Sequence, residues 1–302
     1  MAAGPAIYDL PADAEPIFAA PQESPLKAFL RRFARNRLAV LGAAIIVIEI
    51  ACALAAPLLV PYDPLDQKLD QLTLPESAAH PMGTDELGRD ELSRVIYGTR
   101  VSLQAALYAV GLAALVSVPL GLLVGYYQGF WDEWIVMRLV DALQAFPFLI
   151  LALALAATLG AGFRNAMIAI GIGFLPGFIR IARAQTLAIA NQDYILAARA
   201  VGVRDMRILA RYVLPNALAP LLVQTTLSMA AAILAEAGLS FLGLGVQPPT
   251  PSWGQMLSAA QGYMSSAPWL AYWPGLAIFV SVLGFNLFGD GLRDAFDPRL
   301  RR

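Results

Sequence analysis

Six long apolar runs limit what this chain can fold into more than any other feature of its sequence. The first run, residues 38–60, is 23 residues long, and a helix of that length crosses the roughly 30 Å of a bilayer's hydrocarbon core. Five further runs follow, at residues 101–127, 135–159, 166–181, 217–242 and 271–288. A helix satisfies its own backbone hydrogen bonds, so it is the form that such runs take in lipid. The sequence therefore predicts an all-α, polytopic membrane protein with six transmembrane helices.

The composition agrees with a membrane location and argues against several other classes of protein. Hydrophobic residues make up 58% of the 302 residues and charged residues 14%, whereas a soluble domain has about 25% charged residues. The formal net charge is −1, so no basic field favours nucleic acid as a partner. The single cysteine, Cys52, lies in an apolar run and is expected to pack there. Residues 1–23 are rich in Ala and Pro and lack the basic start of a signal peptide, so we expect a disordered cytoplasmic tail.

Basic residues indicate the side of the membrane on which each loop lies. Residues 24–37 place one apolar stripe among basic side chains, which predicts an amphipathic helix on the inner membrane surface. Residues 180–211 and 293–302 are also basic, whereas the other long loops contain little Lys or Arg. By the positive-inside bias, both termini are cytoplasmic, and residues 61–100 form an extracytoplasmic segment. The other five helices belong to a core domain, residues 101–302.

The charged stretch between the fourth and fifth runs carries two amphipathic patterns. Apolar residues repeat at i, i+3, i+4 and i+7 from Tyr194 and again from Met206. Gly202 lies between the two patterns, and glycine adopts the positive φ that a turn there can require. Asp205 favours the start of the second helix, and Pro215 either ends that helix or opens the next. We therefore predict two short helices joined at Gly202, a pattern equally compatible with an ordinary cytoplasmic loop.

The spacing of small residues in this stretch distinguishes the two interpretations. An Ala-Ala pair, a glycine four residues later and a Leu-Pro after a further gap resemble the EAA loop of ABC-importer permeases, although Leu196 and Tyr212 depart from the family's Glu and Ile. In that family the loop docks into a groove on the ATP-hydrolysing subunit, so the resemblance implies a coupling loop at residues 190–215. Small residues at the pair would let a partner approach closely. The residues assigned to this coupling role are Asp193, Ala197, Ala198, Arg199, Gly202, Leu214 and Pro215.

A second motif lies in the acidic segment that follows the first run. Its spacing resembles the signature of the C-type permease of dipeptide, oligopeptide and nickel importers, as does the run from Glu236 to Gly245. Two arginines among carboxylates predict a salt-bridged collar that orders this segment, in preference to a substrate contact. The motif residues are Gly83, Thr84, Asp85, Gly88, Arg89, Asp90 and Arg94.

Charged residues inside the apolar runs need partners. Glu49 and Glu236 lie deep in their runs, where an ionised carboxylate is unfavourable, so each is expected to face protein or to be protonated. We favour a structural, hydrogen-bonded role for both acids. The alternative is a proton or substrate contact in a stand-alone, proton-coupled secondary carrier, and the lack of a strong internal repeat argues against it. Arg138 and Asp141, one turn apart, are expected to pair.

The residues needed for catalysis and for ATP binding are scarce. The chain has one histidine, His80, and no Cys/His cluster with metal-ligand spacing, so we predict no metal site and no catalytic residues. Lys27 and Lys68 are the only lysines, and neither follows a Gly-x4-Gly, so no phosphate loop is present. The chain is therefore predicted not to be an enzyme and to hold no cofactor of its own.

The resemblance implies a type I ABC importer permease in the cell's inner membrane. Such a chain forms half of the translocation pathway for peptides or similar small solutes. It works with a second homologous permease subunit, with two ABC ATPase subunits that bind ATP and Mg, and with an extracytoplasmic solute-binding protein. Similar scaffolds carry peptides, nickel chelates, glutathione and sugars, so the sequence does not identify the solute. It does not identify the substrate-binding residues either.

Overall fold

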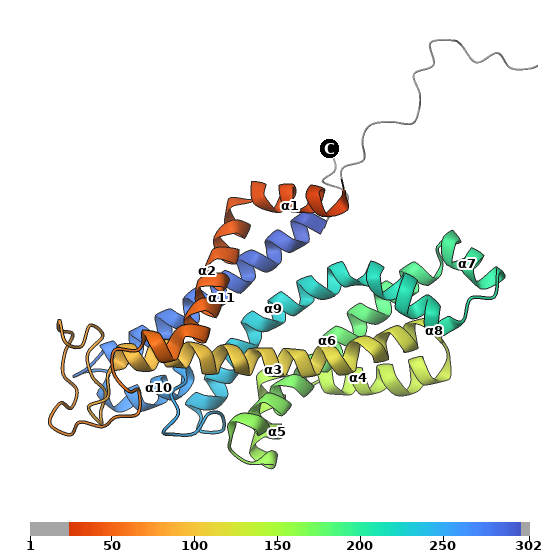
Figure 1. The fold of residues 1–302 in the computed structure, drawn as a ribbon. Coiled ribbons are helices and arrows are strands. Elements are labelled where there is room, and N and C mark those ends of the chain that lie inside the picture. Colours follow the sequence, from red (N-terminus) through yellow and green to blue (C-terminus); the bar gives the residue numbers. More distant parts are fainter. Residues whose placement is uncertain (1–23, 297–302) are drawn as a thin grey trace, which may run out of the picture.

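The computed structural model describes residues 24–296, and every named element in this range is a helix (Figure 1). The predicted tail at 1–23 and the C-terminal residues from 297 lie outside the described residues. Within the described range, 5 helices are long and apolar enough to cross a membrane, and a bent pair of helices makes up to 6. The predicted all-α fold with six crossings is thereby confirmed. Four of these crossings are α2 (Arg37–Leu59), α3 (Glu91–Tyr126), α6 (Phe163–Ala190) and α11 (Trp269–Phe296).

The first helix, α1 (Pro25–Arg35), lies across the ends of α2 and α11, as Figure 1 shows. Its N-cap is Ser24, whose Oγ accepts a hydrogen bond from the Lys27 backbone N–H at 3.3 Å. Its aromatic residues pack on α11, with Phe29 4.7 Å from Phe296 between ring centroids. The amphipathic helix predicted at 24–37 is therefore present, and part of its apolar stripe is covered by protein.

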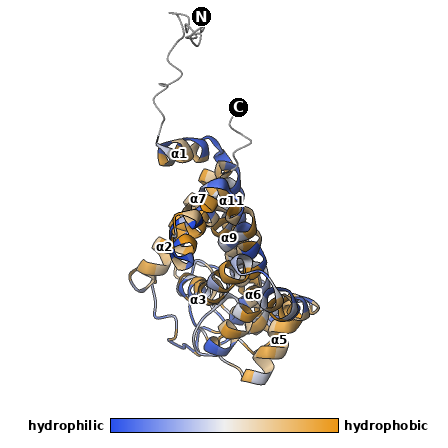
Figure 2. Cartoon of the chain, turned by 90° about the vertical axis from the view of Figure 1, so that its right-hand side faces the viewer, coloured by the Kyte–Doolittle hydropathy of each residue, from blue (hydrophilic) through white to orange (hydrophobic). Residues whose placement is uncertain are grey.

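Hydrophobic side chains cover much of the outer surface of the helices. Figure 2 shows hydrophobic residues along α2 and along α5 (Phe148–Leu159). On α2, Leu54 and Leu58 are 78% and 88% exposed, a degree of exposure for large apolar residues that suits contact with lipid or with another subunit.

The second crossing begins ten residues before the apolar run that predicted it. Asp90 is the N-cap of α3, and its Oδ2 accepts from the Ser93 backbone N–H at 2.8 Å. The first turns of α3 contain polar residues, among them Glu91 and Arg94, which are both buried, and Arg94 pairs with Asp85 of the preceding segment. Hydropathy alone does not detect such a turn, because its polar groups have partners far away in the sequence.

The third apolar run is broken. The π-helical η1 (Trp131–Val136) and α4 (Met137–Gln144) are bent by 95° from α5. The run at 135–159 therefore provides a crossing only as this bent pair of helices. Pro147 precedes α5, and proline disfavours a helical conformation at the residue before it. The Phe148 ring then packs on Phe174 of α6 at 4.6 Å, where Gly173 leaves the necessary room.

The fifth crossing is α9 (Leu214–Phe241). Two shorter helices lie between it and α11: α10 (Trp253–Ala260) and the 3-10 turn η3 (Gln261–Tyr263). In Figure 1, α10 lies beside the segment 61–90 at one end of the molecule. At the opposite end lie α7 (Asp193–Ala200) and α8 (Asp205–Ile208). The two candidate sites found in the sequence therefore occupy opposite ends of the helical bundle.

Candidate functional site

The turn at Gly202 joins α7 to α8, as the sequence predicts. Gly202 has φ +78°, a conformation that glycine adopts freely and β-branched residues avoid. Its backbone N–H donates to Arg199 O at 2.9 Å, and the Val203 N–H donates to Ala198 O at 3.0 Å. These two bonds form a Schellman motif, which satisfies the last carbonyl groups of α7. The turn is thus a defined structure whose shape depends on a left-handed residue at position 202.

The second helix of the loop is continuous with the fifth crossing. After α8, the π-helical turn η2 (Leu209–Val213) leads directly into α9, and the whole stretch from Asp205 to Phe241 is one helix of 37 residues. The Leu214 N–H donates to Leu209 O, a bond of the π type. Pro215 is the second residue of α9 and lies inside this continuous helix, where it supplies no backbone N–H to the preceding turn. The loop therefore consists of α7, a tight turn and the end of a crossing.

Two tyrosines at the end of α3 hold the loop in place through contacts with Asp205 and Arg199. The Tyr126 and Tyr127 hydroxyl groups, at the end of α3, donate to Asp205 Oδ1 and Oδ2 at 2.8 and 3.1 Å. The guanidinium of Arg199 lies 4.6 Å from the centre of the Tyr126 ring, and its Nε donates to the Tyr126 hydroxyl at 3.1 Å. Asp205 begins α8, as expected, but its tyrosine partners were missed because no spacing in the sequence relates them. A separate contact joins α6 to η1: Arg183 Nε and Nη2 donate to Asp132 Oδ1 and Oδ2, each at 2.6 Å.

The loop exposes several large apolar side chains to the surroundings. Val201 is 80% exposed and Met206 59% exposed, values that are high for apolar residues. We call this surface the loop face and define it by Tyr194, Leu196, Ala197, Val201 and Met206. Of the alanine pair, Ala197 lies on the loop face, whereas Ala198 is 8% exposed and packs inside the chain beside Ile195. The small size of Ala198 therefore serves the packing of α7 and is unavailable to a partner.

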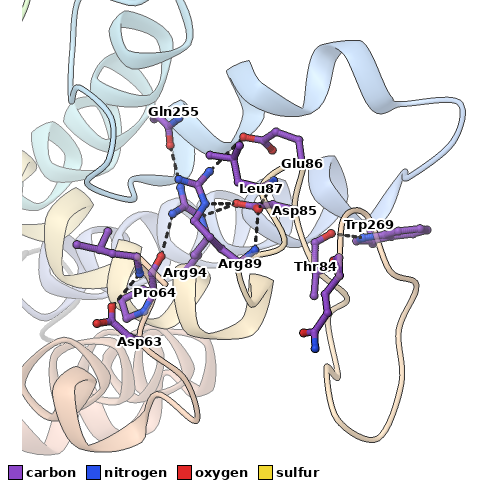
Figure 3. Close-up of polar contacts among 12 residues, drawn as sticks. Asp63, Pro64, Thr84, Asp85, Glu86, Leu87, Arg89, Arg94, Gln255 and Trp269 are labelled. Atoms are coloured by element: carbon purple, nitrogen blue, oxygen red, sulfur yellow. Dashed lines mark hydrogen bonds and ion pairs between the residues drawn. The ribbon is translucent and has the colours of Figure 1, made fainter. Parts of the chain in front are cut away.

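The predicted ion pairs of the segment before α3 are present (Figure 3). Asp85 Oδ2 lies 2.6 Å from Arg89 Nε and 3.3 Å from Arg94 Nε, and its Oδ1 accepts from the Leu87 and Arg89 backbone N–H groups at 2.9 Å. Glu86 contacts Arg89 Nη2 at 3.1 Å. We call these four charged residues, Asp85, Glu86, Arg89 and Arg94, the Asp85 network.

Arg94 connects the Asp85 network to two distant parts of the chain. Its Nη1 donates to Pro64 O at 3.0 Å, and its Nη2 donates to Gln255 Oε1 of α10 at 3.2 Å. The Trp269 indole N–H also reaches this segment, with Thr84 O at 3.3 Å. Because Arg94 is 1% exposed, all of its charge is balanced inside the protein. The network therefore fixes the segment 61–90 onto α3, α10 and α11.

The other motif residues of this segment also have structural roles. Gly88 has φ +73°, and a Cβ there would lie 1.9 Å from Lys68 O; Gly83 has φ +77° and lies against Trp269. Thr84 Oγ1 donates to Gln71 O at 2.6 Å, and Asp90 Oδ1 lies 2.8 Å from His80 Nδ1. Each of these contacts stabilises the path of the segment.

The two acids of the apolar runs each accept a hydrogen bond from a serine of another helix. Glu236 is fully buried, with Oε1 accepting from Ser240 Oγ at 2.7 Å and Oε2 accepting from Ser102 Oγ of α3 at 3.1 Å. Glu49 Oε1 accepts from Ser281 Oγ of α11. These contacts join α9 to α3 and α2 to α11, as expected of acids that hold crossings together.

Comparison with known families identifies two parts of the chain. Residues 117–302 match the family described as "Binding-protein-dependent transport system inner membrane component". Residues 24–75 match the "N-terminal TM domain of oligopeptide transport permease C". Together the two matches include α1, α2 and every crossing from the latter part of α3 onward.

Curated relatives match over nearly their whole length. The chain is 47% identical over 284 residues to the di/tripeptide transport system permease protein DppC of Pseudomonas aeruginosa, which covers 92% of this chain and 93% of the relative. It is 44% identical over 279 residues to the glutathione transport system permease protein GsiD of Pectobacterium atrosepticum, with 92% of each chain covered.

The fold is also similar to a solved structure. An inward-facing conformation of the MetNI methionine ABC transporter contains a chain that aligns with a TM-score of 0.56 and 19% identity, over 68% of this chain and 97% of that chain. Family, relatives and fold agree, and they separate an ABC permease from a stand-alone carrier. The chain belongs to the binding-protein-dependent transport system inner membrane components and is a C-type permease of an ABC importer.

Proposed function

We propose that this permease forms half of the pathway of an importer for peptides or similar small solutes, and that the loop face docks onto an ATPase subunit. The observation that carries the docking role is the loop face itself, an exposed apolar surface on a loop held rigidly by Asp205 and its tyrosines. The solute class is supported by the relatives' names, since di- and tripeptides and glutathione all contain amide groups. A second permease subunit, two ATPase subunits holding ATP and Mg, and an extracytoplasmic binding protein complete the proposed transporter.

The proposed mechanism is alternating access. When ATP draws the two ATPase subunits together, each docked loop face moves with its subunit, and the crossings attached to the loop change their tilt. The residues proposed to carry this motion are those of the turn and the helix start, Asp193, Arg199, Gly202, Leu214 and Pro215, with Ala197 on the contact surface.

The proposed orientation places the loop and both termini on the cytoplasmic side, and the segment 61–90 outside. Support comes from the basic residues of α1 and of the loop. Cysteines introduced at Ser77 and at Ser265, both exposed, are expected to react with an impermeant thiol reagent in intact cells, whereas a cysteine at the exposed Ala200 is not. Labelling of the Ala200→Cys variant from outside would contradict the proposed orientation.

A charge on the loop face is expected to separate the permease from its ATPase. In a Val201→Glu variant, docking would bury an unpaired carboxylate in an apolar contact, which weakens binding by about tenfold or more. The amount of ATPase that co-purifies with the permease measures this effect. Leu69→Glu is the matched control, because Leu69 is 71% exposed but lies in the segment at the opposite end. Equal recovery of ATPase with Val201→Glu and with wild type would exclude the loop face as the docking surface.

A further inference from the structure

Two cavities on the side of α4, α6 and α9 meet at one residue, Gln224. The first, of about 450 Å³, lies at the bend of the broken third crossing and contains Gln144 at the end of α4. The second, of about 510 Å³, continues along α6 and α9 and contains Gln185. Gln224 of α9 lines both cavities. Each volume is within the range of about 300–1,000 Å³ that small-molecule sites occupy.

The polar lining of this groove consists mainly of amide groups. Gln144, Gln185 and Gln224 come from three different helices, and among residues 24–296 the only charged side chain that lines either cavity is Arg293, in the second. A glutamine side chain offers both a donor and an acceptor, the same groups that a peptide bond offers. Such a lining suits a solute recognised by its amide groups, without regard to the charge of its side chains.

The geometry around Gln224 leaves its carbonyl group for a solute. Its Nε2 donates to Ser228 Oγ of the same helix at 3.1 Å. A Cβ at Gly177 would lie 3.6 Å from this nitrogen, so the side chain extends across the space between α9 and α6 over a residue without a side chain. Among the described residues no hydrogen bond involves Oε1, so this oxygen can accept from an N–H group in the groove.

The surroundings of the groove are unsuited to lipid. Asp141 and Arg180 form an ion pair between α4 and α6, one helical turn from Gln144 and from Gly177, and their side chains are 48% and 46% exposed. An exposed ion pair on membrane crossings is unfavourable against hydrocarbon and occurs where water or protein faces it. The broken third crossing, between α4 and α5, also requires water or protein beside it. The backbone N–H and C=O groups at the break lack helical hydrogen-bond partners and need polar neighbours.

We propose that this groove is the solute path within this subunit, and that Gln224 Oε1 accepts a hydrogen bond from the peptide N–H of the passing solute. The class of solute in this proposal rests on the proposed function. The new element is the residue that binds the amide group of the solute, Gln224. Gln144 lines the first cavity and Gln185 the second, so each provides a further amide contact in one of the two cavities that Gln224 shares.

The first experiment tests whether the groove contains water. Cys52 is the only cysteine of the chain, so a Cys52→Ala background gives single-cysteine variants. In the assembled transporter, Gln224→Cys is expected to react with a charged, water-soluble methanethiosulfonate reagent at least tenfold faster than Leu222→Cys, which lies on the same helix but lines neither cavity. Equal rates for the two variants would overturn the proposed path, whatever solute is transported.

The second experiment tests the contact with the peptide N–H. The probes are the dipeptide Ala-Ala and alanyl-lactate, in which an ester oxygen replaces that N–H. Loss of one neutral hydrogen bond corresponds to about a 2- to 10-fold change. We expect Gln224→Leu to reduce the uptake ratio of Ala-Ala to alanyl-lactate by that factor, because the ester analogue does not use Oε1.

Two comparisons make this second experiment decisive. Thr225→Val removes a hydroxyl that bonds only to Leu221 O within its own helix, so this variant should keep the wild-type ratio. A purely structural role of Gln224 would lower the uptake of both probes equally, and an unchanged ratio in Gln224→Leu would overturn the proposed contact. If the wild-type transporter moves neither probe, the peptide assignment fails, while the labelling experiment still decides whether the groove is the path.

Discussion

A Gly202→Val variant is expected to insert normally and to lose solute transport. Among the described residues, no heavy atom beyond Gly202 and its two chain neighbours lies within 4 Å of the position that a Cβ would occupy there, so the effect comes from the backbone. Valine at φ +78° is strained by about 1–3 kcal/mol, enough to open the Schellman motif that ends α7. The loop face would then lose its shape, whereas the crossings bury their own surfaces and do not depend on it. Uptake by the reconstituted transporter and recovery of the ATPase measure the loss.

A graded series separates backbone strain from the loss of a glycine. Asparagine tolerates the left-handed conformation better than other non-glycine residues, so Gly202→Asn should retain more transport than Gly202→Val. Gly111→Val is the matched control, since Gly111 lies in the helical backbone of α3 with open space around it. Wild-type transport by Gly202→Val, with the ATPases bound, would show that the turn has no part in coupling.

An Asp85→Asn variant is expected to lose the fixed structure of the segment 61–90. The substitution leaves the guanidinium groups of Arg89 and Arg94, 3% and 1% exposed, without their shared carboxylate. Breaking a buried ion pair from one side costs about 3–5 kcal/mol. We expect a lower midpoint of thermal unfolding in detergent and faster proteolysis within 61–90.

The neighbouring acid provides the control for this variant. The Glu86 side chain is 20% exposed and makes one contact with Arg89, so Glu86→Gln should change the free energy of unfolding by less than about 1 kcal/mol. If Asp85→Asn and Glu86→Gln show the same unfolding midpoint and the same proteolysis rate as wild type, the Asp85 network does not hold the segment.

The features predicted correctly from the sequence are those that depend on neighbouring residues. Apolar runs gave the crossings, because burial in lipid depends on the average character of some twenty residues. The turn at Gly202 followed from two amphipathic patterns with a glycine between them, and φ +78° agrees with it. Glu49 and Glu236 were expected to face protein or to be protonated, and each has a serine partner on another helix.

The features that were missed depend on residues far apart in the sequence. Arg138 and Asp141 were expected to pair from their spacing, but Asp141 pairs with Arg180 of α6, and Arg138 lies 5.4 Å from the Trp134 ring centre. Helix α3 begins early because Arg94 is neutralised by Asp85 and bonded to Gln255, which is 161 positions away. In each case the packing of distant helices supplied a partner that local spacing does not reveal.

The angle of the broken third crossing could not be predicted either. Pro147 is visible in the sequence, but a proline only disfavours one continuous helix and sets no angle of 95°. That direction depends on Phe148, which packs against Phe174 in the space left by Gly173. The groove at Gln224 exists because of this bend, so the amide lining was also invisible in the sequence.

The continuous helix from Asp205 to Phe241 determines how far a small movement of the loop displaces residues along the fifth crossing. At about 1.5 Å per residue its 37 residues measure roughly 55 Å, so each degree of swing about one end moves the other end by about 1 Å. In a rigid-body swing of this helix, which contains Pro220, Gln224 lies near the middle and moves about half as far. Because Glu236 ties the distant end to Ser102 of α3, that end acts as the pivot, and a rotation of only a few degrees at the loop changes the width of the groove by about the size of an atom.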